Sequence, residues 1–457
     1  MKNIFKVMKH TKAKAVISAV MVLCLLCSSV CLSGCLNSNA GGIGSQGQQV
    51  TVVQADTSAL PDYVAKLVKL DEVFKAYSYS GYDEEAFADM ILKYYIAATG
   101  DMYAEYMTPE EYEAYFAESA GEFVGVGISI VETIANLNGY NYKVMQVISV
   151  FKDSPALEHG IKVGDLIVYA GAGDEKELVN TLGYNEALSR LRGPEGTVAE
   201  FTVFRPDDSE VSGYKVIDFA IERKKVTTES VTYRLSETDD KVGIVHISSF
   251  DQTTAIQFTD AVDTLLDMGC EYFVFDVRNN PGGALASIEA VLSYFLERND
   301  LIIGIEYGDG STEADYVSVR NYGPMYEGFN VRSSDIGKYK KLKSVVITNG
   351  NTASAAELFT ATFRDYGIAE IVGETTYGKG CMQTILPLDE FGLEGGLRVT
   401  TAMYFSASRE IYHEIGIVPD YEVSLSEEAL DYNFYLLPES KDAQLQKAIE
   451  ILINNND

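Results

Sequence analysis

The chain has 457 residues, more than one ordinary domain of roughly 150, and therefore predicts two or three domains. Its content of 47% hydrophobic and 23% charged residues is globular, which excludes a wholly disordered or collagen-like chain. Asp and Glu (67) outnumber Lys and Arg (36), giving a net charge of −31, so nucleic acid is not an expected partner, because phosphate binding needs clustered basic residues.

The first 35 residues have the pattern of an export signal. Lysines between Lys2 and Lys14 precede an apolar run over 15–32, which is the charged-then-apolar order of a secretion signal. The small residues directly before Cys35 resemble the lipobox of bacterial lipoproteins. We therefore expect a signal peptide over 1–34, a lipid on Cys35 and a location on the outer face of the bacterial cell membrane. An uncleaved anchor and an ordinary signal peptide are the alternatives.

The next two segments differ in composition. Residues 35–59 are rich in Gly, Ser and Gln and predict a flexible tether. Over 60–122, apolar residues recur at helical spacing and predict a helical N-terminal segment. Within it, Thr108 followed by Pro109 and two acids predicts a helix start, with a hydroxyl cap and negative charge in the first turn.

From Phe123 the pattern changes to that of strands. A Ser-Pro-Ala turn follows at 154–156 and a Gly-Asp turn at 164–165. With this spacing of turns, residues 123–222 resemble a PDZ domain of the bacterial protease type. The resemblance implies a mainly β domain that binds an extended peptide as an added strand. A Gly-x-Gly sequence alone would indicate only a β-turn. The residues expected to hold the peptide carboxylate on their main-chain N–H groups are Gly125, Val126, Gly127 and Ile128.

Beyond residue 240, strands and helices alternate, which is typical of an α/β domain. We expect an α/β core over 223–425 and a C-terminal helical segment over 426–457. The stretch 306–338 has no assigned structure. The predicted strands cover 242–250, 272–277, 342–348 and 368–372, and the predicted helices cover 253–268, 284–297, 355–366 and 442–453.

Two predicted strand-to-helix turns contain candidate chemical groups. Strand 342–348 leads into a turn that places Ser354 at the start of a helix, where its hydroxyl is available and the helix favours negative charge. The N–H of Ala355 can then point at a developing oxyanion. The turn over 276–283 can bring a glycine N–H to the same sheet edge, which is where open α/β sheets bind ligands.

The base that would activate this serine stays open on the residues alone. His159 lies in a predicted turn, His246 lies within a predicted strand, and His413 near the chain end is a candidate. The competitor is Lys379, because a lysine surrounded by glycines can be enclosed, and burial favours the neutral form that acts as a base. The residues before Lys379 also fit the start of a phosphate-binding loop, but Gly380 lacks the hydroxyl that Mg²⁺ needs, so nucleotide binding is not expected.

In order along the chain, the motifs GIVHISSF, FDVRNNPGG, NGNTASAAE, VGETTYGKGCMQ and GIVPD resemble those of the carboxyl-terminal processing (tail-specific) serine proteases. The resemblance covers most of 100–450 and implies a crotonase- or Clp-like α/β core with an inserted PDZ domain. It implies Ser354 as the nucleophile, Lys379 as the general base and Gln383 as the residue that orients the lysine. The oxyanion donors would be the N–H groups of Ala355 and Gly282.

These observations predict an exported, membrane-tethered serine endopeptidase that recognises protein C-termini. Its expected substrates are proteins or peptides with free, apolar C-termini. No cofactor and no metal is expected. The sequence has no H-E-x-x-H motif, and the closely spaced Cys24, Cys27 and Cys31 lie in the signal peptide that we expect to be removed. A homodimer through the terminal helices, as in relatives, stays open. The alternative function is a PDZ-type peptide-binding module with an inert protease core.

Overall fold

The computed structural model describes residues 60–119, 122–137, 139–207, 209–410 and 412–454. The expected signal peptide over 1–34, Cys35 and the tether over 35–59 lie outside the described residues. The chain divides into two compact units, one reaching Tyr112 and including Gln383–Thr400, the other made of Glu113–Met382 and Thr401–Asp457. In the part of the chain that the structure describes, each helix is too short or too polar to cross a membrane.

The first unit contains two long helices and a short strand. Helices α3 (Asp62–Tyr77) and α4 (Glu84–Ala97) precede β1 (Glu105–Met107), which pairs antiparallel with the first residues of β18 (Gly396–Phe405). Helix α5 (Pro109–Ser119) begins where the Thr-Pro pattern indicates. The Thr108 hydroxyl accepts from Glu111 N at 3.3 Å and the Glu111 carboxylate accepts from Thr108 N at 3.0 Å, so the two residues form a reciprocal cap.

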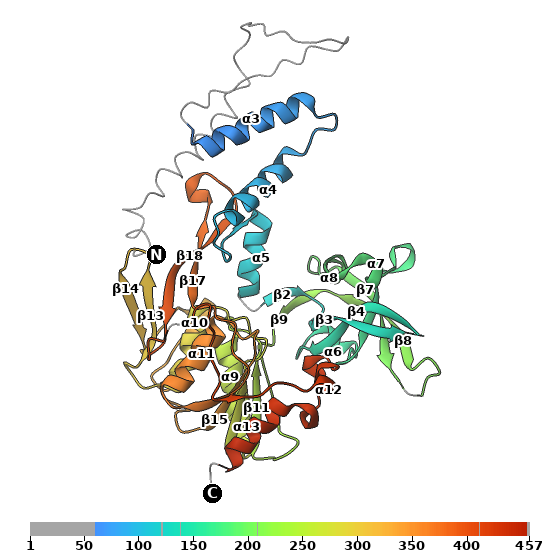
Figure 1. Ribbon diagram of the computed structural model, residues 1–457. Coiled ribbons are helices and arrows are strands. Elements are labelled where there is room, and N and C mark those ends of the chain that lie inside the picture. Colours follow the sequence, from blue (N-terminus) through green and yellow to red (C-terminus); the bar gives the residue numbers. More distant parts are fainter. Residues whose placement is uncertain (1–59, 120–121, 138, 208, 411, 455–457) are drawn as a thin grey trace, which may run out of the picture. The chain divides into compact units, whose positions relative to one another are not determined.

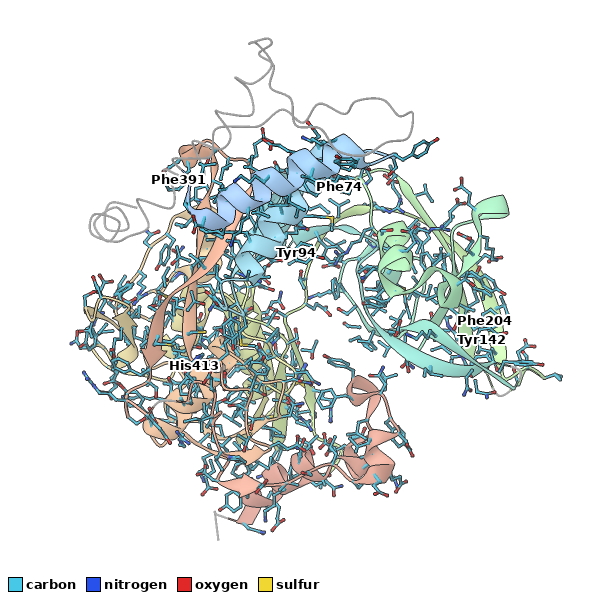
Figure 2. All side chains as sticks on the ribbon, turned by 45° about the horizontal axis from the view of Figure 1, so that its top comes forward. Phe74, Tyr94, Tyr142, Phe204, Phe391 and His413 are labelled. Carbon is cyan, nitrogen blue, oxygen red and sulfur yellow. The ribbon has the colours of Figure 1, made fainter. Side chains whose placement is uncertain are left out.

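Residues 128–222 form a separate, mainly β part of the second unit (green in Figure 1). Met145 and Phe201 lie in its apolar core, and Tyr142 and Phe204, labelled in Figure 2, each pack against a second apolar cluster. Strand β3 is at the edge of the sheet. The sheet has the order β3 (Ile128–Leu137), β4 (Tyr140–Val150), β5 (Leu166–Ala170), β7 (Val198–Pro206), β8 (Tyr214–Glu222), with β6 (Glu177–Leu178) on β5 and the helices α6 (Pro155–Glu158), α7 (Val179–Leu182) and α8 (Tyr184–Leu191).

A two-stranded ribbon flanks this part in the chain, β2 (Glu122–Gly125) pairing antiparallel with β9 (Lys224–Thr227). A six-stranded central sheet follows, and all its neighbouring strands are parallel except the first pair. The predicted α/β core is therefore confirmed. The strand order is β10 (Val231–Leu235), β11 (Val242–Ile247), β12 (Tyr272–Asp276), β15 (Lys343–Thr348), β16 (Ala369–Gly373), β19 (Tyr421–Glu422).

Helices cover both faces of the central sheet, as parallel strands require (Figure 1). Helices α9 (Thr254–Asp267), α10 (Leu285–Ser293) and α11 (Ala355–Asp365) pack on one face, and α13 (Ala443–Asn454) packs on the other. The alternation within β12 shows this: Phe273 and Phe275 pack toward the first three helices, whereas Val274 packs with residues of α13.

Two predicted elements end earlier than the sequence indicates, and the strand predicted over 242–250 is one of them, because β11 ends at Ile247. Helix α10 was predicted to reach residue 297 but ends at Ser293, because Tyr294 N and Phe295 N bond three residues back in tighter turns. The unassigned stretch 306–338 contains β14 (Thr312–Tyr316), which pairs with β13 (Leu301–Tyr307). The remaining elements are β17 (Cys381–Pro387), which pairs with β18, the helix α12 (Glu427–Leu430), and the 3-10 turns η2 (Gly173–Glu175), η3 (Pro324–Phe329), η4 (Asp389–Phe391), η5 (Phe434–Leu436) and η6 (Glu439–Lys441).

Candidate active site

Ser354 lies in the turn between β15 and α11, where the sequence places it. Its φ of 57° is in the left-handed region, which is strained for a residue with a side chain and occurs at functional turns. Ala355 is the first residue of α11, so its N–H has no acceptor within the helix. The serine is half-buried at the positive end of the helix, where an anion is stabilised.

The turn after β12 packs directly against this serine. Gly282 has a φ of 102°, and a Cβ atom there would lie 2.6 Å from Ser354 Cβ and 2.8 Å from Ala355 N, so only glycine fits. The structure thus brings Gly282 beside Ser354 and Ala355. The Gly282 N–H donates to Asn280 Oδ1 at 2.8 Å, so an oxyanion would compete with this side chain for it. The donor roles of Gly282 and Ala355 stay predictions.

Side-chain amides fix the two turns to each other. Asn279 Oδ1 accepts from Asn349 Nδ2 and from Asn351 Nδ2, both at 2.9 Å, while Asn349 Oδ1 accepts from Asn279 N at 3.0 Å. The main chain adds a bond from Ala353 N to Asn280 O at 2.9 Å. Side-chain and main-chain hydrogen bonds between the two turns therefore fix the distance of Gly282 from Ser354.

A buried carboxylate connects Ser354 to the segment that contains Lys379. Glu357 Oε2 accepts from Ser354 N at 2.9 Å and from Lys379 N at 2.7 Å, and Oε1 accepts from Thr376 Oγ1 at 2.6 Å and from Gly378 N at 2.7 Å. Sharing one oxygen at hydrogen-bond lengths keeps the two main-chain nitrogens of Ser354 and Lys379 within about 6 Å of each other. Burial raises the pKa of the Glu357 carboxyl, and the four donors oppose that rise.

Tyr404 of β18 contacts the segment that contains Lys379. Its hydroxyl donates to Lys379 O at 2.7 Å. Burial raises the pKa of the Tyr404 phenol above its ordinary value, so the hydroxyl keeps its proton at neutral pH. Sequence reasoning assigned no role to Glu357 or Tyr404. The only local signal was an acid three residues after the N-cap serine, the spacing of a capping box.

Residues 241–423, which include this site, match the model of peptidase family S41. The chain is 28% identical over 364 residues to the carboxy-terminal processing protease CtpA of Bacillus subtilis, covering 80% of this chain and 70% of the relative. Residues 241–423 therefore form an S41-type peptidase domain, and over most of its length the chain is similar to C-terminal processing serine proteases.

Further comparisons agree with this family. A probable CtpA-like serine protease of Staphylococcus haemolyticus is 27% identical over 324 residues, which cover 71% of this protease but only 57% of the relative. A solved structure of a putative S41 protease from Bacteroides fragilis superposes with a TM-score of 0.55 at 17% identity, covering 83% of this protease and 93% of the other chain. The superposition with the Bacteroides fragilis structure shows a shared fold.

Gln383 of the protease is the first residue of the segment that belongs to the smaller compact unit. Its Nε2 donates to Thr400 Oγ1 at 3.3 Å, and Thr400 donates to the Asp101 carboxylate from both its N–H and its hydroxyl, each at 3.0 Å. Thr400 thereby links Gln383 to the loop before β1. The role of Gln383 in orienting Lys379 stays a prediction.

The expected peptide-binding residues of the protease lie between β2 and β3. Gly127 has a φ of 84°, and a Cβ atom there would lie 2.3 Å from Ser154 Cβ, so this position requires glycine. Val126 O and Gly127 O accept main-chain N–H groups from the segment 151–156 at 2.8 and 3.0 Å, which fixes the loop between Gly125 and Ile128. Ile128 begins the edge strand β3. A PDZ-type peptide site stays a prediction.

Two of the three histidines considered as the general base, His159 and His246, have contacts that indicate a structural role. His159 Nδ1–H donates to Pro155 O at 2.7 Å within the small α6 region. Burial lowers the pKa of His246, which lies in β11 beside Asp276, so it is neutral. Across the described residues, three or more His, Cys, Asp or Glu side chains nowhere form a group that could hold a metal ion.

Proposed function

We propose that this protease cleaves peptide bonds with Ser354 as the nucleophile and Lys379 as its general base. The observation that carries the proposal is the Glu357 carboxylate, which accepts from the main-chain N–H groups of both residues and so fixes them relative to each other. Main chains held this close allow the Lys379 amine to reach the Ser354 hydroxyl, which is the pairing that activated serines require.

The mechanism follows from these positions. Neutral Lys379 takes the proton from the Ser354 hydroxyl as its oxygen attacks the substrate carbonyl. The resulting oxyanion is stabilised by the N–H of Ala355 at the start of α11, and by that of Gly282 if it exchanges its bond to Asn280. The lysine then gives its proton to the leaving amine, and a water attacks the acyl-enzyme to release the second product.

We further propose that residues 123–222 bind the C-terminus of the substrate as a PDZ domain does. The support is the glycine-containing loop 125–128 followed by the edge strand β3, to which an extended peptide could be added. Ile128 and Ile130 of this strand, together with Leu188 of α8, are half-buried against the core and provide apolar contact for peptide side chains. This favours substrates with free, apolar C-termini.

The test compares the full-length chain, purified in detergent, with its Ser354→Ala and Lys379→Ala variants on an unstructured protein with an apolar C-terminus. The exposed Ser333→Ala is the matched control. We expect cleavage by the parent and the control alone. If the parent is silent while it binds a C-terminal peptide, the protein is a peptide-binding module with an inert core. A peptide amidated at its C-terminus should bind more weakly if the carboxylate is recognised.

The location is a separate proposal. The lysine-rich start, the apolar run and the small residues before Cys35 support export and lipid attachment at that cysteine, which would hold the protease on the outer face of the cell membrane. Mass spectrometry of the mature chain is expected to find a lipid on Cys35 as the first residue. An intact N-terminus or an unmodified Cys35 would contradict the proposal.

A further inference from the structure

The main chain around Lys379 is held on every side. From Gly378 to Gly380 there are three N–H groups and three carbonyls, and all six have a partner: the N–H groups of Gly378 and Lys379 donate to Glu357, and the carbonyls of Lys379 and Gly380 accept from Tyr404. The last two partners come from the segment after β18. Glu414 N donates to Gly378 O at 2.7 Å, and Gly380 N donates to His413 Nδ1 at 3.2 Å.

The glycines beside the lysine allow this close packing. A Cβ atom on Gly378 would lie 2.9 Å from Gly416 N, and one on Gly380 would lie 3.1 Å from His413 Cβ. The segment 413–416 therefore lies against the main chain on both sides of Lys379. His413, which is labelled in Figure 2, is half-buried. Of the six partners, it is the only imidazole.

The hydrogen bond from Gly380 decides which ring nitrogen carries the proton. Nδ1 accepts, so it is unprotonated, and the neutral ring carries its proton on Nε2. In this arrangement neither nitrogen of His413 is free to take a proton from Ser354. The sequence left His413 open as a candidate base, and the geometry points to a different role.

We infer that His413 is a positioning residue for Lys379, because it holds the main chain of the residue directly after the lysine. The inference rests on the proposed function of Lys379 as the general base. Loss of the acceptor leaves the Gly380 N–H without its partner, so this end of the segment can move and the lysine amine moves with it. A displacement of about 1 Å at a reacting group can lower the rate by about 100-fold.

Two substitutions separate the hydrogen bond from the packing. His413→Asn keeps an acceptor, since its Oδ1 is attached to Cγ just as Nδ1 is in histidine, whereas His413→Leu fills a similar volume without one. On the full-length chain we expect His413→Leu to lower kcat by about 10- to 100-fold with KM unchanged, and His413→Asn to recover it to within about threefold. An equal loss in both variants, or parental kcat in the leucine variant, overturns the inference.

A second measurement shows whether the effect passes through the lysine. The rate at which a fluorophosphonate reacts with Ser354 reports on the base, because the serine oxygen displaces fluoride while its proton passes to that base. We expect His413→Leu to slow this reaction in the parent but not in a Lys379→Ala background. An equal slowing in both backgrounds contradicts the positioning role.

The same series distinguishes failure of the inference from failure of the proposed function. If Lys379→Ala reacts at the parental rate while both His413 variants are inactive, histidine is the base, and both proposals are wrong. If Lys379→Ala is inactive and His413→Leu retains the parental rate, the lysine base stands and only the positioning role fails.

Discussion

Replacing Glu357 with glutamine should weaken both the fold and the chemistry of this protease. The carboxylate accepts four hydrogen bonds with two oxygens, and an amide of the same shape has only one oxygen. Either Ser354 N and Lys379 N, or Thr376 Oγ1 and Gly378 N, would then face an NH₂ group that cannot accept.

The magnitude follows from the bonds that are lost. A hydrogen bond to a charged group contributes about 1.5–3 kcal/mol, so two lost bonds correspond to about 3–6 kcal/mol. Part of this is offset because burial already raises the pKa of Glu357, which means that the buried charge itself is unfavourable. We expect a net loss of about 2–3 kcal/mol in the free energy of unfolding. Because Ser354 and Lys379, the proposed nucleophile and base, lose a common anchor, we expect kcat to fall at least about 100-fold.

Urea unfolding and peptide cleavage, each measured at neutral pH, test both numbers. The exposed Glu306→Gln in β13 is the matched control and should change neither quantity. If Glu357→Gln keeps the parental midpoint and the parental kcat, the shared carboxylate does not position Ser354 and Lys379. A loss of stability alone, with kcat unchanged, would limit Glu357 to a structural role.

Three further substitutions test other features. Gly282→Ala should reduce kcat by about 100-fold, since its Cβ would lie 2.6 Å from Ser354 Cβ, whereas the unobstructed Gly308→Ala should be neutral; equal rates in a cleavage assay would contradict this. Burial raises the pKa of Glu289 to about 8, so the stabilisation from its protonated form is greatest below the ordinary carboxyl pKa and is lost as pH rises through 8. Glu289→Gln should remove this loss of up to about 5 kcal/mol in the free energy of unfolding. Urea unfolding at several pH values measures the difference. Asp442→Ala leaves the buried Arg278 with fewer partners and should cost about 3 kcal/mol in the same assay, and a parental midpoint would show that Arg278 does not need this partner.

The sequence was sufficient for the parts of the site that local patterns control. The alternation of strands and helices predicted the central sheet, and the rule that ligands bind at the carboxyl ends of parallel strands predicted that Ser354 and a glycine of the turn 276–283 lie near each other. The structure places them in contact. Ser354 also lies directly before α11, at the point where the sequence pattern changes from that of a strand to that of a helix and so predicts a turn.

The parts that could not be predicted depend on contacts between distant residues. Tyr404 and His413 meet the Lys379 segment through bonds that link residues more than twenty positions apart, and nothing in their own neighbourhoods indicates it. Strand β14 was missed because four of its five residues are exposed, so the apolar alternation of a strand is absent. The occupied N–H of Gly282 also could not be foreseen, because it depends on the rotamer of Asn280.

Helix α13 has a consequence for the order in which the protein can form. It packs on β11, β12, β15 and β16 on one face of the central sheet, and Asp442 just before it pairs with Arg278, four residues before Gly282. A nascent chain that has not yet supplied residues 442–454 therefore has an apolar sheet face without a cover and a buried arginine without its second partner. Catalytic competence should therefore require that residues 442–454 have been made and packed, so that a chain interrupted before residue 442 does not cleave.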